Sequence, residues 1–253
     1  MTVAGLRLDA LVRTDVGRVR DHNEDAYCER PQSGVWAVAD GMGGHERGEW
    51  ASATIAEALG QVPPQPDFDT LLQRAADAIH AANGRIFAEA EAKGAQMGST
   101  VVALVVKDRR FGVLWAGDSR GYLLRGGFLH RLTRDHTQVQ EMVDRGLLTP
   151  EAAEGHPMGH VLARAVGVRG TLELDAIADG VEPGDVFLLC SDGLTGVVEE
   201  PEIARMLDPS TARTAPDALV ELVLERGAPD NVTVVMVSAS EPTLLSFAAG
   251  ETG

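Results

Sequence analysis

The chain has 253 residues, of which 44% are hydrophobic and 24% charged, and its formal net charge is −16. Such a length and composition are typical of one globular domain with a well-developed core. The acidic balance argues against nucleic acid as a partner, because phosphate backbones are bound by basic surfaces. No apolar run approaches the eighteen or so residues of a membrane span, so we expect a soluble protein with no membrane partner.

The chain contains two cysteines, Cys28 and Cys190, and the second falls inside an apolar run. We therefore expect no disulfide framework and a reducing compartment, the cytoplasm. We also predict a single domain over residues 1–240, a monomer by default, and a weakly ordered tail at 241–253.

The first third of the chain carries strand and helix patterns in turn. Alternation of apolar and polar residues predicts a half-buried strand at 6–13, and an apolar run predicts a buried strand at 34–39. After a Gly-rich turn, apolar residues at three- and four-residue steps predict two helices. The first ends at Gly60 and the second covers about 68–92, although Gly84 weakens the latter.

A block of strand patterns follows, at 100–106, 110–115, 121–124 and 128–132. These runs lie close together along the chain, and the last two are separated by a Gly-Gly turn. We therefore predict that they form one antiparallel meander.

Residues 138–165 differ in character, with two short helical pieces and several Gly and His residues, and we interpret them as an irregular flap. The remaining predicted elements are strands at 171–177, 186–190 and 231–237 and helices at about 200–207 and 215–226. Strands and helices thus occur in blocks. This favours an α+β fold, a four-layer α-β-β-α sandwich of two antiparallel sheets packed face to face with helices outside.

Four aspartates share one local setting. Asp40, Asp118 and Asp192 each end an apolar run, and Asp230 opens one. If these strands share a sheet or sandwich, the carboxylates converge. Two carboxylates about 4 Å apart repel by roughly 4 kcal/mol at an effective dielectric near 20, so such a cluster needs counter-charge. Divalent cations would supply it.

Five short motifs contain these acids and their neighbours. They are Arg20-Asp-His-Asn-Glu-Asp25, Asp40-Gly-Met-Gly-Gly-His45, Gly117-Asp-Ser-Arg120, Ser191-Asp-Gly-Leu194 and Asp230-Asn-Val-Thr233. Together and in this order they closely resemble the metal-dependent protein serine/threonine phosphatases of the type 2C (PPM) family, in its bacterial form. The resemblance runs from about residue 8 to 238.

The resemblance implies hydrolysis of phosphoserine and phosphothreonine on proteins, opposing a bacterial Ser/Thr kinase. It also implies two Mn²⁺ or Mg²⁺ ions, hard cations that prefer oxygen ligands. Asp40 would bridge both ions and the Gly41 carbonyl would bind one, while Asp192 and Asp230 would complete the ligands of the other. In the family, the residue matching Asp118 can bind a third ion together with Asp192.

Other positions take supporting roles by the same resemblance. Glu24 and Asp25 would hold metal-bound waters, and Arg20 would bind the substrate phosphate. Our mechanistic hypothesis is single-step hydrolysis by a water that bridges the two ions, without a phosphoenzyme. Eukaryotic members carry a His as general acid directly after the Asp-Gly, where this chain has Met42. The proton donor stays open between His45 and a metal-bound water.

Simpler interpretations exist for the same residues. Arg20 could be a surface ion-pair residue, and Asp118 and Asp192 could be turn residues. The domain as a whole could be an inactive sensor or scaffold, or it could hydrolyse a small phosphorylated molecule. The histidines without metal-ligand spacing are predicted to be surface or structural residues: His22, His80, His130, His136, His156 and His160.

Two other chemistries are excluded by the sequence itself. A cysteine-nucleophile phosphatase needs an Arg six positions after its Cys, where this chain has Gly34 and Gly196. An EF-hand starting at Asp40 would need a Glu at its twelfth position, which is Ala51.

Overall fold

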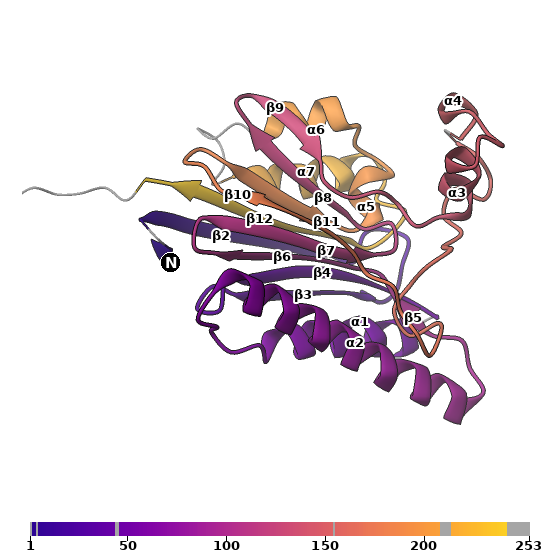
Figure 1. Ribbon diagram of the computed structural model, residues 1–253. Coiled ribbons are helices and arrows are strands. Elements are labelled where there is room, and N and C mark those ends of the chain that lie inside the picture. The colour runs from indigo at the N-terminus through magenta and orange to yellow at the C-terminus, as the bar shows by residue number, and fades with distance from the viewer. Residues whose placement is uncertain (1, 4, 44–45, 154, 208–213, 242–253) are drawn as a thin grey trace, which may run out of the picture.

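The computed structural model describes residues 2–3, 5–43, 46–153, 155–207 and 214–241. Over these residues the strands form two antiparallel sheets packed face to face (Figure 1). The first sheet has the order β1 (Thr2–Val3), β2 (Leu6–Asp15), β12 (Val232–Ser240), β11 (Val186–Cys190), β8 (Arg120–Arg125) and β9 (Phe128–Arg131). The second has the order β10 (Asp175–Gly180), β7 (Arg110–Ala116), β6 (Val101–Lys107), β4 (Val35–Met42) and β3 (Asp25–Arg30), with β5 (Gly98–Ser99) paired to β4.

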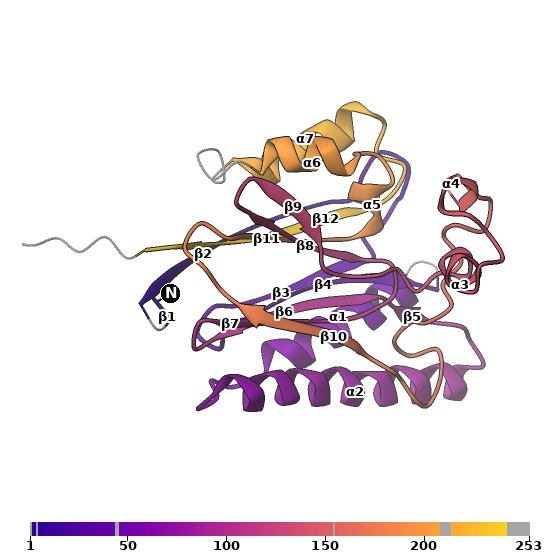
Figure 2. The same cartoon turned by 45° about the horizontal axis from the view of Figure 1, so that its top comes forward.

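Helices cover the outer faces of both sheets (Figures 1 and 2). α1 (Glu46–Gly60) and α2 (Phe68–Lys93) pack on the second sheet, and α5 (Asp192–Thr195), α6 (Glu200–Met206) and α7 (Ala215–Glu225) pack on the first. The predicted α+β sandwich of four layers is therefore confirmed. In α2, the Asp67 side chain accepts a hydrogen bond from Thr70 N, and Gly94 ends the helix in the left-handed conformation.

The position of β4 between two apolar cores explains why its sequence is almost continuously apolar. Side chains alternate between the two faces of a strand. Val35 and Ala37 face the core under α1 and α2, whereas Trp36 and Val38 face the core between the sheets. Both faces of the strand are buried, so the sequence shows an apolar run without alternation.

The predicted single meander is wrong. β6 pairs with β7 in the second sheet, whereas β8 pairs with β9 in the first. The chain crosses between the sheets at residues 117–119, where Gly117 has φ +112° and a Cβ on it would lie 2.6 Å from the Thr100 Cβ. Both β7 and β8 are buried in apolar surroundings, so their composition does not reveal the crossing.

Two strand predictions need further correction. β3 was not predicted, because only Cys28 of its six residues is buried and the strand lies at the sheet edge. β10 begins at Asp175 rather than at residue 171, since Leu172 and Leu174 pack against the α1/α2 core before the strand starts. The remaining predicted strands and helices are confirmed, with bounds that differ by a few residues.

Residues 138–165 project from one end of the sandwich (Figures 1 and 2). They carry the two predicted short helices, α3 (Gln138–Asp144) and α4 (Pro150–Ala153). Val139 is the one buried residue of these two helices. This segment is called the flap below. The tail predicted at 241–253 lies outside the described residues from 242 onward.

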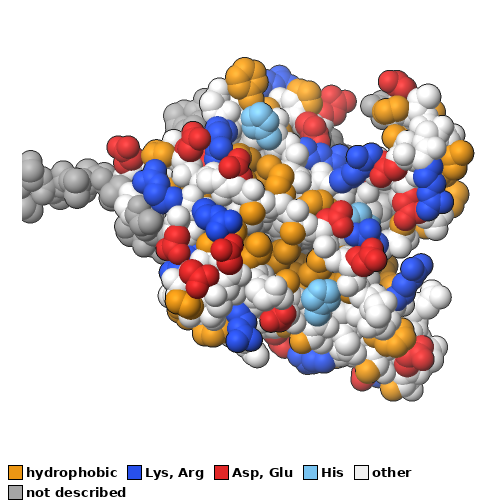
Figure 3. Space-filling view, viewed as in Figure 1, with side chains coloured by type: hydrophobic (Ala, Val, Ile, Leu, Met, Phe, Trp, Pro, Cys, Tyr) orange, Lys and Arg blue, Asp and Glu red, His pale blue; other side chains and the backbone are white. Residues whose placement is uncertain are grey.

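The face seen in Figure 3 mixes acidic and basic side chains around apolar ones near its centre. A shallow cavity of about 410 Å³ lies between α2 and β10, lined by apolar residues that include Leu72, Leu114 and Leu174. Among the described helices, none has the length and apolar character that crossing a membrane would require.

Candidate active site

A cavity of about 520 Å³ lies at the end of the sandwich from which the flap projects. Strands of both sheets end or begin at this cavity, so the four aspartates do converge. The predicted site residues that line it are Arg20, Glu24, Asp40, Gly41, Asp118, Asp192 and Asp230. Residues that are far apart in the sequence therefore share one pocket.

Asp40 is fixed by its neighbours in the second sheet. It lies opposite Asp25 in the β3–β4 ladder. Its backbone N–H donates to Thr100 Oγ1 at 3.0 Å, and its carbonyl accepts from Thr100 N at 2.9 Å. The hydroxyl oxygen of Thr100 also lies 2.6 Å from that of Ser119, next to Asp118. Thr100 thus ties the turn that carries Asp118 to the end of β4.

Gly41 is required by close packing of the chain. Its N–H donates to the Glu24 carbonyl at 3.0 Å. A Cβ at this position would lie 2.2 Å from the carbonyl oxygen of Gly48, which leaves no room for any other residue. The loop that carries Glu24, the end of β4 and the first turns of α1 therefore lie in direct contact beside the cavity.

Asp192 sits where β11 turns into α5. The Ser191 hydroxyl donates to Asp25 Oδ2 at 2.8 Å and accepts from Thr233 N at 3.0 Å, which links the two sheets beneath the cavity. A Cβ on Gly193 would lie 1.9 Å from the Asn231 carbonyl oxygen. The absence of a side chain there lets the end of β11 approach the start of β12.

Asn231 holds the loop that brings Arg20 to the site. Its side-chain amide donates to the carbonyls of Val16 and His22 at 2.8 and 2.9 Å, and its Oδ1 accepts from Glu24 N at 2.8 Å. Arg20 then reaches the cavity, where its Nη2 donates to Asp230 Oδ2 at 2.8 Å. Arg20 is therefore an ion-pair residue, as the simpler interpretation of the sequence had it. The partner of Arg20 is Asp230, one of the four converging aspartates.

The negative charge at the floor of the cavity is largely uncompensated. Burial raises the pKa of Asp40 well above its usual value, and the nearby carboxylates of Asp25, Asp192 and Asp118 raise it further. Burial also raises the pKa values of Asp25 and Asp118, and the charge of Asp192 adds to both. In each case burial disfavours the charged form first, and the neighbouring carboxylates disfavour it further.

This donor set fits a divalent cation. All four converging side chains offer carboxylate oxygens, the ligands that Mg²⁺ and Mn²⁺ prefer. Asp25 Oδ1 is buried and has no hydrogen-bond partner among the described residues. Within the same part of the chain, no three His, Cys, Asp or Glu side chains already form a ligand cluster. The carboxylates line one cavity without being gathered around a single point.

Two histidines bear on the open question of the proton donor. His45 lies outside the described residues, and Met42 lines the cavity. His160, predicted to be a surface or structural residue, also lines the cavity, although its side chain is 81% exposed. Its Nδ1 lies 3.7 Å from Asp192 Oδ2, and hydrogen bonding to Asp192 raises the pKa of His160.

Several residues that position the acids were not predicted from the sequence. Ser191 and Asn231 stand next to predicted ligands within the motifs, so their polar side chains were a usable signal. Thr100 carried no such signal, because its partner Asp40 is distant along the chain. The apolar residues that line the cavity, called the apolar wall below, were not predicted either; they are Met42, Val161, Leu162, Ala163, Ala165 and Val168.

A two-sheet sandwich with carboxylates converging at its strand ends is the arrangement expected for the phosphatases that the motifs resemble. A sequence profile of the family described as "Protein phosphatase 2C" matches residues 18–225. The chain belongs to the protein phosphatase 2C family.

Relatives with similar sequences are named serine/threonine phosphatases. The "Serine/threonine protein phosphatase PstP" of Mycobacterium tuberculosis is 38% identical over 252 residues, which cover 94% of this chain and 48% of that protein. The chain therefore spans about half the length of this relative. The "Serine/threonine phosphatase stp" of Listeria innocua is 35% identical over 243 residues, covering 91% of this chain and 95% of that one.

Solved structures have the same fold. "PppA, a key regulatory component of T6SS in Pseudomonas aeruginosa" superimposes with a TM-score of 0.85 at 40% identity, over 92% of this chain and 97% of that one. The catalytic domain of PstP "in complex with 2 Manganese ions" gives a TM-score of 0.81 at 38% identity, over 93% of this chain and 99% of that one.

Proposed function

We propose that this chain hydrolyses phosphoserine and phosphothreonine in proteins, as a single domain over residues 1–240, with two Mn²⁺ or Mg²⁺ ions as cofactors. The observation that carries the proposal is the convergence of Asp40, Asp118, Asp192 and Asp230 in one cavity. Its relatives PstP and stp are named serine/threonine phosphatases, and the PstP catalytic domain has been solved with two manganese ions.

The predicted ligand set assigns a part to each acid. Asp40 would contact both ions, the Gly41 carbonyl would bind one, and Asp192 and Asp230 would bind the other. Asp118, together with Asp192, would hold a third. When bound, such ions lower the pKa of a water that bridges them toward neutrality and polarise the phosphoryl group, which is the chemistry needed for direct hydrolysis.

Arg20 is placed to bind the substrate phosphate. Its guanidinium carries five N–H donors in a planar fork. The contact to Asp230 uses Nη2, and the side chain is 56% exposed at the cavity. The remaining donors can bind phosphate oxygens in the geometry that guanidinium groups favour. Glu24 lines the same cavity and Asp25 lies opposite Asp40 in the β3–β4 ladder, where both can orient water.

The biological setting follows from this reaction. A phosphatase of this specificity counteracts a Ser/Thr protein kinase, and its partners are the phosphorylated proteins of that kinase. Cys28 and Cys190 are both buried free thiols, which agrees with a reducing compartment such as the cytoplasm. We propose a monomer that acts there.

Turnover of phosphopeptides tests the proposal. Phosphoserine and phosphothreonine peptides should be hydrolysed with Mn²⁺ and not with excess EDTA, and faster than phosphotyrosine peptides or small phosphomonoesters. Asp40→Asn should be inactive, while Asp77→Asn, an exposed carboxylate on α2, should retain activity. Activity that persists in EDTA or in Asp40→Asn contradicts the proposal. Preference for a small phosphomonoester points to a metabolite hydrolase, and a wild type inactive on every substrate points to a scaffold.

A further inference from the structure

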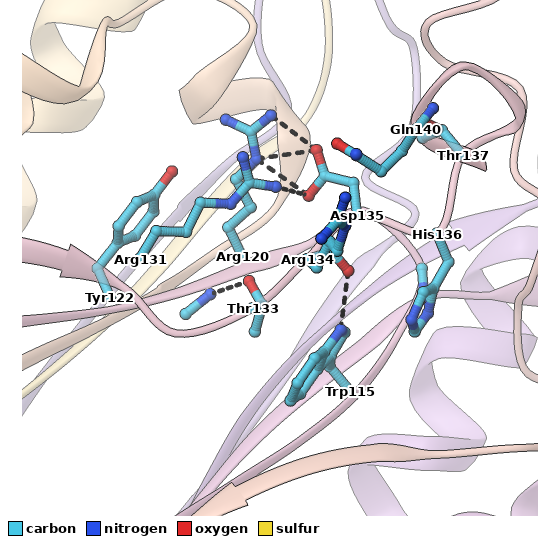
Figure 4. Close-up of polar contacts among 12 residues, drawn as sticks. Trp115, Arg120, Tyr122, Arg131, Thr133, Arg134, Asp135, His136, Thr137 and Gln140 are labelled. Carbon is cyan, nitrogen blue, oxygen red and sulfur yellow. Dashed lines mark hydrogen bonds and ion pairs between the residues drawn. The ribbon is translucent and has the colours of Figure 1, made fainter. Parts of the chain in front are cut away.

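Residues 132–137 join β9 to α3. Figure 4 shows Arg134, Asp135 and His136 of this segment together with Trp115 and Arg120, which stand on either side of the turn that carries Asp118. The Arg134 carbonyl accepts a hydrogen bond from Trp115 Nε1 at 2.9 Å, at the end of β7. Asp135 binds Arg120, at the start of β8, through Nη2 at 2.7 Å and Nε at 3.1 Å. The segment is therefore attached to the strands on both sides of the turn.

His136 contacts the turn itself. Its backbone N–H donates to the Gly117 carbonyl at 2.9 Å, and its Nδ1 accepts from Gly117 N at 3.2 Å. Gly117 directly precedes Asp118, whose side chain is buried at 8% exposure. His136 thus holds both the N–H and the carbonyl of Gly117, the residue directly before Asp118. His136 is itself buried and stacks on Trp115, with ring centroids 6.2 Å apart.

The same segment also holds both ends of the flap. At the end where the flap begins, Thr137 caps α3 by accepting from Gln140 N. At the far end, the His136 carbonyl accepts from Ala163 N at 2.8 Å. His136 Nε2 lies 3.3 Å from Asp175 Oδ2, and Asp175 in turn binds Arg164 at 2.6 Å. Ala163 and Arg164 both line the cavity.

The hydrogen-bond pattern fixes the tautomer of His136. A backbone N–H can only donate, so Nδ1 must be the acceptor, and the ring proton of the neutral imidazole resides on Nε2. Nε2 lies 3.3 Å from both Asp175 Oδ2 and Arg164 Nη1. A guanidinium can only donate, so with the proton on Nε2 the carboxylate of Asp175 is its acceptor. Burial, together with the charge of Arg164, lowers the pKa of His136 and so favours the neutral ring.

We propose that His136 is a positioning residue with two separable tasks. Its Nδ1 fixes the turn that places Asp118, and its Nε2, through Asp175, fixes the end of the flap that lines the cavity. The first task bears on cation binding by Asp118 and so rests on the proposed function. The second rests on the contacts alone.

Two conservative variants separate these tasks. An Asn side chain can place its Oδ1 near the position of Nδ1, so His136→Asn keeps an acceptor for Gly117 N and loses the reach to Asp175. A Gln side chain can place its amide near the position of Nε2, so His136→Gln keeps a donor toward Asp175 and loses the acceptor for Gly117. His130→Gln, at an exposed histidine on β9, is the control.

The readouts are Mn²⁺ binding by isothermal titration calorimetry and amide hydrogen exchange of residues 161–165 by mass spectrometry. In His136→Gln, the affinity for the Mn²⁺ ion that is lost in Asp118→Asn should fall about 10- to 100-fold, as for other residues that orient a metal ligand. Exchange at 161–165 should stay near the wild-type rate. In His136→Asn, Mn²⁺ affinity should stay near wild type and exchange should accelerate.

Specific outcomes overturn the proposal. If both variants impair both readouts equally, with a matching loss of thermal stability, His136 is a general core residue. If neither variant changes either readout, it positions nothing. A wild type that binds no Mn²⁺ overturns the proposed function and the first task with it. Exchange at 161–165 then still decides the second task. A wild type that binds Mn²⁺ while His136→Gln binds it unchanged refutes the first task alone.

Discussion

The floor and the roof of the cavity are built in opposite ways. The floor consists of the strand ends that carry Asp40, Asp118, Asp192 and Asp230, and each end is tied to another by hydrogen bonds or by glycine contacts too close for a side chain. The roof, residues 160–168, follows the two short helices α3 and α4. Of the residues in these helices, Val139 alone is buried. The side chains of the roof include Val161 and Val168, which are 39% and 50% exposed.

With the function proposed above, this difference assigns the chemistry to the floor and the choice of substrate to the roof. The floor shares its packing with the cores of both sheets, so a change there affects every substrate and the stability of the fold as well. The roof is attached to the sandwich through Val166, which is buried and pairs with Ser99. The side chains of Val161 and Val168 are partly exposed, so a change at either one alters the shape of the cavity while the carboxylates stay in place. We expect floor variants to affect all substrates equally and roof variants to affect only substrates large enough to reach the apolar wall.

Asp40→Asn should have the largest effect of any single substitution at the floor. The change removes a charge and the proposed anionic ligand, while it preserves the shape of the side chain and the backbone contacts to Thr100. Substitution of a residue that only orients a metal ligand lowers metal affinity or activity about 10- to 100-fold. Loss of a direct ligand should therefore lower turnover by more than about 100-fold. Rates on phosphopeptides and on p-nitrophenyl phosphate should fall together, and a selective loss on peptides would contradict a role in the common chemistry.

Gly193→Ala tests the packing of the floor. A methyl group would lie 1.9 Å from the Asn231 carbonyl oxygen, so the starts of α5 and β12 must separate. Overpacking of this kind costs about 1–3 kcal/mol in free energy of unfolding. The matched control is Gly84→Ala in α2, where nothing lies within 4 Å and alanine should stabilise the helix by about 1 kcal/mol. Urea unfolding of both variants gives the comparison, and equal stability of the two would show that the floor can relax.

The sequence predicted the floor far better than the roof. Each acid adjoins an apolar run. Such runs identify buried strands, and the ends of buried strands meet at the edges of the sheets. The family resemblance then supplied the roles. The crossing between sheets at Gly117 was missed, because β7 and β8 are both buried and composition does not record which sheet a strand joins. Pairing is decided by long-range packing that no local pattern contains.

Contacts between residues that are far apart in the chain could not be predicted from local sequence patterns either. Thr100 and Ser119 meet across the site, and nothing near either residue in the sequence indicates the other. His136 was predicted to be surface or structural, and its buried contacts to Gly117 and Asp175 depend on where β7, β10 and the flap meet. The apolar wall was missed because Val161 and Val168 lie in an irregular segment without periodicity.

The pH dependence of stability should reveal the protonation of the buried carboxylates at the floor. Burial raises the pKa of Asp25 to about 7, from a usual value of 3.8. The folded protein then binds a proton that the unfolded chain has released, so the free energy of unfolding falls as pH rises from about 4 to about 7. Thermal unfolding in EDTA should show this decline. Asp25→Asn should make it shallower, while the raised pKa values of Asp40 and Asp118 should leave part of it in place. Mn²⁺ should also flatten it by supplying positive charge. A decline unchanged in Asp25→Asn would assign it to other groups.

Val168→Ser should have the smallest effect and the most selective one. The substitution replaces part of the apolar wall with a hydroxyl, while the carboxylates and Arg20 are untouched. Burying one methyl or methylene group is worth about 0.8 kcal/mol, so kcat/KM should fall about 3- to 10-fold for phosphopeptides with an apolar residue beside the phosphoserine. It should stay unchanged for p-nitrophenyl phosphate. Ile177→Ser, at a 39% exposed position on β10 outside the cavity, should leave both rates unchanged. If the small substrate slowed as much as the peptides, roof and floor would not be independent, and the separation of chemistry from substrate choice would have to be abandoned.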